Sequence, residues 1–109
     1  MEAFEAFGLI DIRVGRVDRV ELNAEAHKPA YKIWIDFGEL GVKTSSGRYT
    51  QLYRPEDLQG KTVVCAVNLG KRKIAGFTSE VLMLGVEKEP GQVVYLTTER
   101  EVPIGGKIF

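Results

Sequence analysis

The chain of 109 residues has few of the features that mark disulfide-bonded, metal-binding, nucleic-acid-binding or membrane proteins. It has one cysteine, which excludes a disulfide within the chain. It has one histidine, and no residues are spaced as the ligands of a metal site are. Its formal net charge is zero, so no overall attraction draws it to nucleic acid. It shows no secretory leader, and no apolar run is long enough to span a bilayer. We expect a cytoplasmic protein with no metal and no membrane contact.

Residues for catalysis are equally scarce. His27 stands alone in a polar loop, and Cys65 lies in the apolar run Val63–Val67, where it is expected to be a small buried hydrophobic residue. No glycine loop of the phosphate-binding kind is present, and no nucleophile lies beside a base. The sequence therefore predicts no catalytic residue, no cofactor and no enzyme.

Alternating apolar and polar residues, by contrast, are frequent and predict strands. Tyr31–Phe37 alternates most regularly. Leu9–Leu22 predicts a longer strand whose phase slips at Gly15–Arg16, which indicates a bulge or a sharp coil there. A tight turn at Gly38–Glu39 is expected to lead into a hairpin partner at Leu40–Thr44.

A short helix is predicted at Tyr53–Gly60, because Pro55 suits the first helical position and two acids follow it. Lys61–Leu69 is apolar on both faces and predicts a central, doubly covered strand. Further strands are expected at three ranges: Val81–Val86, Gln92–Thr97 and the C-terminal Val102–Phe109.

These elements predict an all-β domain: a five-stranded Greek-key barrel of the OB type, with one short helix after the third strand. An SH3-like barrel is the structural alternative, although it usually lacks that helix. We expect one domain over residues 1–109, with terminal extensions at 1–8 and 90–109. The extension at the N-terminus carries Phe4 and Phe7 on one side of a helical turn, and two such rings need a cover.

The polar face of the predicted sheet carries cations and one aromatic residue. Trp34 lies there beside Lys32, and Lys43 and Ser45 are expected to project from the next strand on the same face. A basic stripe with an aromatic ring is typical of surfaces that bind single-stranded or loop RNA. An ordinary solvated sheet face explains the same pattern, and Trp34 could equally pack against a loop or a second subunit.

The densest cation cluster is the run Lys71–Lys73, which is expected to form a loop before a buried strand. A phosphate would relieve the mutual repulsion of its charges, although a solvated loop is the plainer explanation. Ser79, Glu80 and Asn68 lie close to this run in the chain and offer groups that hydrogen-bond bases or ribose.

Several blocks of the chain resemble the tRNA-binding OB domain, which is appended to methionyl- and phenylalanyl-tRNA synthetases and also occurs as free-standing dimers. The blocks are Asp11–Val17, His27–Gly38, Tyr53–Gly60, Val67–Leu69 and Arg72–Leu82. Among these proteins the chain is most similar to the CsaA-type export chaperones. The synthetase-appended branch commonly has methionine and arginine where this chain has Ile74 and Ala75, which favours the chaperone branch.

The resemblance implies three sets of site residues. Two aromatic residues, Trp34 and Phe77, would stack on bases or line a peptide groove. The dimer interface would include Phe4, Phe7, Ile108 and Phe109. The residues implied to contact RNA are Lys43, Ser45, Asn68, Arg72, Lys73, Ser79 and Glu80.

The resemblance also implies the partners: tRNA or structured RNA, unfolded precursor polypeptides, and a second copy of the chain. The function expected is that of a tRNA-binding protein that also acts as an export-related chaperone. The alternative is a secretion chaperone that binds peptides and has little physiological RNA binding.

Overall fold

The computed structural model describes residues 1–109 and consists mostly of strands. The helices are α1 (Ala3–Leu9) and α2 (Pro55–Leu58), with a 3-10 turn, η1, at Gly38–Leu40. The strands are β1 (Ile12–Leu22), β2 (Tyr31–Asp36), β3 (Val42–Gly47), β4 (Thr62–Ala66), β5 (Arg72–Ile74), β6 (Phe77–Ser79), β7 (Leu82–Met83), β8 (Gly85–Glu89) and β9 (Gln92–Tyr95). The all-β prediction is confirmed.

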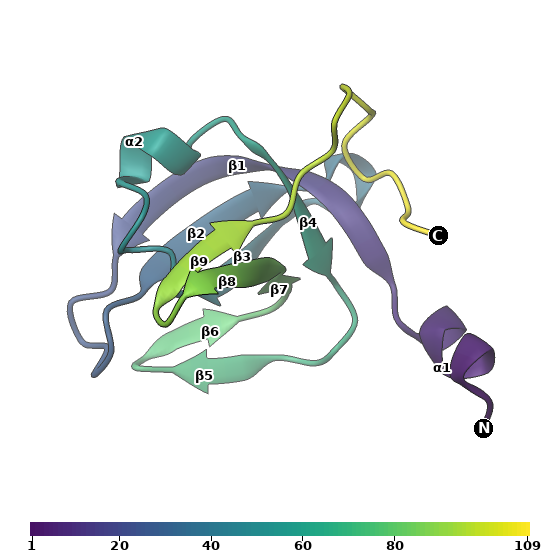
Figure 1. The fold of residues 1–109 in the computed structure, drawn as a ribbon, viewed down its shortest axis with the longest axis horizontal. Helices are drawn as coiled ribbons and strands as arrows, with labels where there is room; N and C mark the ends of the chain where they lie inside the picture. Colours follow the sequence, from purple (N-terminus) through teal and green to yellow (C-terminus); the bar gives the residue numbers. More distant parts are fainter.

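Five strands form one antiparallel sheet in the order β3-β2-β1-β4-β7, which curls into a nearly closed barrel (Figure 1). The hairpins β5–β6 and β8–β9 are separate two-stranded sheets beside it. Helix α2 lies between β3 and β4 in the chain, and its Leu58 is fully buried in the core. This order and this helix position are those of an OB barrel, so the SH3-like alternative is excluded.

Strand β1 organises the barrel because its two halves pair with different strands. Residues 12–16 pair with β4, and residues 16–22 pair with β2. The C-terminal segment covers part of the first half: Val14 donates to the carbonyl of Gly106, and Ile108 donates to that of Ile12. The predicted terminal strand at Val102–Phe109 is therefore reduced to a single bridge, between Arg13 and Lys107.

The irregularity predicted at Gly15–Arg16 lies elsewhere. The register between β1 and β2 shifts between Val17 and Arg19, so Asp18 is the extra residue. Gly15 is regularly paired with Val63, and its missing side chain leaves room for Ile35 and Phe37. The glycine thus serves close packing over the core, while the bulge gives the strand its sharper coil.

The alternation in Tyr31–Phe37 is confirmed, because every second residue of this stretch is buried. Helix α2 is shorter than predicted. Its cap, Arg54, donates its backbone N–H to the carboxylate of Asp57, and Pro55 opens the helix. The largest fully buried core residues are Phe37, Ile33, Ile35, Leu58, Val17, Val63 and Cys65.

Two predictions about the second half of the chain are wrong. The range Val81–Val86 is two strands, β7 and β8, that belong to different sheets. The basic run is part of a hairpin, β5–β6, rather than a loop. Its two-residue turn, Ala75–Gly76, has positive φ angles of 47° and 80°, as the turns that suit the twist of a hairpin require.

Helix α1 stands away from the barrel at the end of the molecule where both termini lie (Figure 1). None of its residues is buried, and Phe4 and Phe7 are 87% and 49% exposed. Phe109 is fully exposed at the other terminus, whereas Ile108 is half-buried against β1. The barrel does not cover these apolar side chains.

Candidate nucleic-acid interface

Three of the predicted RNA contacts, Ser45, Ser79 and Glu80, form hydrogen bonds where the barrel closes. Strand β3 meets the segment between β6 and β7 through side chains as well as backbone. The hydroxyl of Ser79 accepts the N–H of Ser46 at 2.9 Å, and that of Ser45 accepts the N–H of Met83 at 3.3 Å. One carboxylate oxygen of Glu80 accepts both the N–H and the hydroxyl of Thr44, at 3.2 and 3.0 Å. Ser45, Ser79 and Glu80 therefore have structural partners, and their contact with RNA stays a prediction.

The face predicted for Lys43 and Ser45 is wrong. Trp34 pairs with Thr44, and Ile33 pairs with Ser45, so Ser45 points into the core and is fully buried. A two-residue turn at Gly38–Glu39 would have paired Trp34 with Lys43. The connection is longer and includes the 3-10 turn η1, which shifts the register by one residue and exchanges the two faces.

Three of the predicted RNA contacts do gather around one hollow of about 310 Å³. Lys43, Asn68 and Glu80 line it. Lys71, which belongs to the predicted basic run but not to the RNA contacts implied by the resemblance, lines it as well. The amide of Asn68 is already used, because it accepts the N–H of Asp11 and donates to the carbonyl of Leu9, both at 2.8 Å. Asn68 thus holds the junction between α1 and β1. The two lysines have no carboxylate within ion-pairing distance.

Arg72 and Lys73 lie apart from that hollow, on the exposed strand β5. Arg72 lines a different hollow, of about 470 Å³, together with Arg48 and Tyr49. The five predicted residues Lys43, Asn68, Arg72, Ser79 and Glu80 therefore do not line one common hollow, although Arg72 pairs across the β5–β6 hairpin with Ser79, the neighbour of Glu80.

The outer face of the β1–β2–β3 sheet carries an aromatic pair with cations. Trp34 and Phe77 meet edge to face with their ring centroids 5.5 Å apart. The guanidinium of Arg19 lies 4.7 Å from the centroid of the Trp34 indole ring. The ammonium of Lys32 lies 5.8 Å from the centroid of the Phe77 ring. Both rings are half-buried, so each has neighbours within the chain and an edge that a ligand could reach.

A cleft of about 560 Å³ lies beside this face, between the loop 23–30 and the β5–β6 hairpin. His27 and Lys28 line it from the loop, Ile74 and Ala75 from the hairpin, and Arg48 from the end of β3. OB folds bind oligonucleotides and oligosaccharides between these two connections. Lys28 and Arg48 were missed from the sequence, since each is an isolated cation; only the place of the loop between the first two strands could have indicated Lys28.

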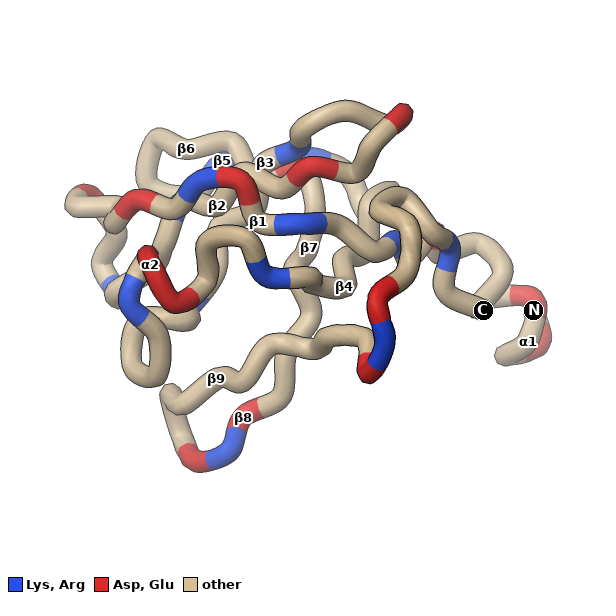
Figure 2. Tube along the Cα trace, turned by 90° about the horizontal axis from the view of Figure 1, so that it is seen from above, with Lys and Arg blue, Asp and Glu red and all other residues tan.

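Acidic and basic residues alternate along the trace, and no face of a single sign appears in Figure 2. Attraction of an anion must therefore be local.

Burial raises the pKa of the Cys65 thiol to about 12, so this thiol is neutral and unreactive in the folded protein. No three His, Cys, Asp or Glu side chains lie close enough to hold a metal ion. Neither helix has the length and hydrophobicity needed to cross a bilayer.

Comparison with known proteins identifies the family. The family described as "Putative tRNA binding domain" matches residues 12–107. Methionine–tRNA ligase of Archaeoglobus fulgidus is 38% identical over 106 residues, which are 97% of this chain and 16% of the ligase. The chain thus spans about a sixth of that curated relative, and the match to the ligases is a match to their tRNA-binding part.

Several solved structures match the whole chain, and two of them are chaperones. The chaperone CsaA from Bacillus anthracis is 46% identical with a TM-score of 0.90, and the match covers 100% of this chain and 99% of that one. The CsaA chaperone protein from Picrophilus torridus is 41% identical, also with a TM-score of 0.90 and full coverage of both chains. With its OB barrel, the match of the family model to residues 12–107 and these full-length matches, the chain belongs to the tRNA-binding domain family.

Proposed function

We propose that this protein binds tRNA or similarly structured RNA on the outer face of the β1–β2–β3 sheet and in the hollows at its margins. The observation that carries the proposal is the pair Lys43 and Lys71, two cations without an acidic ion-pair partner that line one hollow at the edge of an OB barrel. Contacts between such cations and RNA phosphates supply a large share of the affinity of a protein for RNA. Unpaired bases can contact the exposed parts of the Trp34 and Phe77 rings.

The experiment is fluorescence anisotropy with labelled total tRNA at 50 and 200 mM KCl. Saturable binding that weakens steeply with salt is expected, and the K43Q/K71Q variant is expected to bind at least fivefold more weakly. The matched control is K61Q/R100Q, which removes the same charge from exposed positions outside the hollow. An absence of saturable binding by the wild type would refute the proposal.

A second candidate function is that of a chaperone for unfolded precursor polypeptides in export. It is favoured by the two CsaA structures, which this chain matches over its full length. The protein is then expected to slow the aggregation of a denatured client. The Trp34→Ala variant is expected to lose that activity, because the Trp34–Phe77 pair puts two half-buried aromatic rings on this face, where an apolar side chain of a peptide can contact them.

The two functions are separated by competition. If tRNA displaces the client, both use one surface; if the client is protected and tRNA does not bind at all, the protein is a peptide-binding chaperone only. Unchanged protection by Trp34→Ala would remove the indole from the peptide site. Both functions place the protein in the cytoplasm, where tRNA and unexported precursors occur together.

The exposed apolar residues of α1 and the C-terminus support a further part of the proposal, a homodimer. Phe4, Phe7 and Phe109 lie at the same end of the molecule and are uncovered by the barrel (Figure 1). A second copy that covers these residues would bury them in the way that homodimer interfaces do.

We expect the F4A/F7A variant to raise the dissociation constant of the dimer by at least tenfold, since two large apolar side chains are removed from the interface. Sedimentation equilibrium at micromolar concentration measures this constant. The control is Leu22→Ala, which truncates an apolar residue 59% exposed at the opposite end of β1. A wild-type protein that sediments as a monomer would contradict the dimer.

A further inference from the structure

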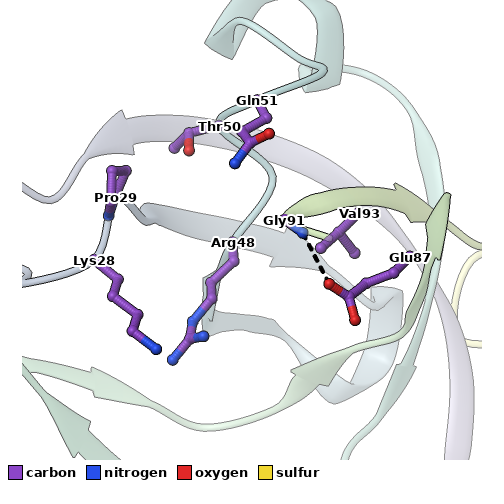
Figure 3. A pocket seen from close by; sticks show the side chains of 8 residues that line it. All are labelled: Lys28, Pro29, Arg48, Thr50, Gln51, Glu87, Gly91 and Val93. Atoms are coloured by element: carbon purple, nitrogen blue, oxygen red, sulfur yellow. Dashed lines mark hydrogen bonds between the residues drawn. The ribbon is translucent and has the colours of Figure 1, made fainter. Parts of the chain in front are cut away.

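A second basic hollow lies on the other side of Arg48, between the loop 23–30 and the β8–β9 hairpin. Its volume is about 540 Å³, and its lining includes Lys28, Arg48, Thr50, Gln51 and Val93 (Figure 3). In Figure 3 the side chains of Lys28 and Arg48 come from different elements and point toward each other. None of the residues implied by the family resemblance lines this hollow.

The charges of this hollow are unbalanced at its basic end. All five ion pairs of the structure involve other residues, so Lys28 and Arg48 have no carboxylate within 4.0 Å. The one acid in the lining is Glu87, and its carboxylate accepts the N–H of Gly91 at 2.9 Å in the turn of the β8–β9 hairpin. Two cations that converge on a common space repel each other, and an anion between them removes that repulsion.

Arg48 also connects this hollow to the rest of the surface. It lines the cleft between the loop 23–30 and the β5–β6 hairpin, and it lines the hollow that contains Arg72. Lys28 is shared between the cleft and the second basic hollow. An extended ligand in the cleft therefore passes Lys28 and Arg48 on its way toward β8–β9.

We propose that Lys28 and Arg48 form a phosphate-binding site for the backbone of an RNA strand that leaves the cleft toward the β8–β9 hairpin. The inference rests on the proposed RNA binding and extends it to a second stretch of the RNA. Arg48 supplies a planar fork of donors that matches a phosphate, and Lys28 supplies a point charge. Thr50 and Gln51 add neutral groups suited to phosphate oxygens and the ribose 2′-hydroxyl.

The lining also favours RNA over a polypeptide at this position. Val93 is the one hydrophobic residue of the hollow, so the apolar side chains of an unfolded chain would find little to contact. An acidic peptide shares the charge of RNA but not its ribose hydroxyls. It is therefore the competitor that the experiment must include.

The experiment compares the affinities of wild type, K28Q/R48Q, Arg48→Lys and the K61Q/R100Q control for labelled tRNA over a series of KCl concentrations. K28Q/R48Q is expected to bind at least tenfold more weakly at 100 mM KCl. The slope of log K against log salt is negative, and its magnitude is expected to decrease by about 1.4 to 1.8. Each lost phosphate contact lowers that magnitude by about 0.7 to 0.9. Arg48→Lys is expected to keep most of the slope and lose a few-fold in affinity, and the control is expected to stay within twofold. All four positions are exposed, so folding should be unaffected.

The outcomes separate this inference from the proposed function. If wild type binds tRNA and K28Q/R48Q binds as the control does, the site is overturned and the proposed function stands. If wild type does not bind tRNA, titration with pyrophosphate decides whether an anion site exists. Amide shifts at residues 48–51 that vanish in K28Q/R48Q then support the site, and their absence overturns it. An oligoglutamate peptide that shifts the same amides more tightly than an RNA oligonucleotide of equal charge would overturn the assignment to RNA.

Discussion

Replacing Gly15 with valine is expected to lower the free energy of unfolding by about 3 kcal/mol, a large part of the total for a domain of this size. A Cβ atom at this position would lie 2.5 Å from Cγ2 of Ile35 and 2.8 Å from Cε1 of Phe37. Both side chains are almost completely buried, so neither can move aside without disturbing the core. Urea denaturation followed by tryptophan fluorescence measures the change.

The matched control is Gly8→Ala in α1, where no atom lies within 4 Å of the added methyl group. It is expected to raise stability by no more than about 1 kcal/mol, because alanine favours a helix more than glycine does. A Gly15→Val protein as stable as this control would mean that the core around Ile35 and Phe37 has space that the structure does not show. The expected result follows from the place of Gly15 over the core and holds whatever the protein binds.

The second large effect is expected for Ser79→Ala, at the seam where β3 meets the segment before β7. The hydroxyl of Ser79 accepts the N–H of Ser46 at 2.9 Å and donates to the carbonyl of Val81 at 3.1 Å, and the residue is 8% exposed. Alanine leaves both backbone groups without this partner. An unsatisfied buried group costs about 1 to 3 kcal/mol, so a loss of about 2 kcal/mol is expected.

Thermal and urea unfolding of Ser79→Ala should be compared with Thr78→Ala, which removes an exposed hydroxyl one residue earlier on the same strand. Equal stability of the two variants would contradict a structural role for the Ser79 hydroxyl. The affinity for tRNA, measured below the unfolding transition of both, tests the other role. If Ser79 also contacts RNA, its variant binds more weakly than Thr78→Ala even when fully folded.

This double role matters for the whole predicted RNA set. Ser45, Ser79 and Glu80 are polar residues with partners inside the chain, so a loss of binding after their substitution does not by itself identify a contact. Lys43, Lys71, Lys28 and Arg48 are better probes, because each lines a hollow and none takes part in an ion pair.

The structure also changes the interpretation of the basic run Lys71–Lys73. The sequence predicts it as a loop of three cations before a buried strand. In the structure Arg72 and Lys73 lie on β5, an exposed edge of a hairpin, and only Lys71 faces the hollow with Lys43. A charged edge strand is also a common protection against unwanted strand pairing, so part of this charge needs no ligand.

Local patterns in the sequence determined the strands and the helix from β1 to β4 and their order. Strict alternation placed β2, proline and two acids placed α2, and a doubly apolar run placed β4, because these signals act over a few neighbouring residues. The order of those elements, with one helix after the third strand, was enough to predict an OB barrel. The family resemblance agreed with it.

Only the tertiary structure decided which side chains face each other. One residue more in the connection around η1 exchanged the faces of β3 and sent Ser45 into the core, and a period of two makes every such register shift invert the strand. Lys28 and Arg48 are 20 positions apart in the sequence and share a hollow because the loop after β1 returns to the end of β3. Such meetings depend on long-range chain closure, which no local pattern records.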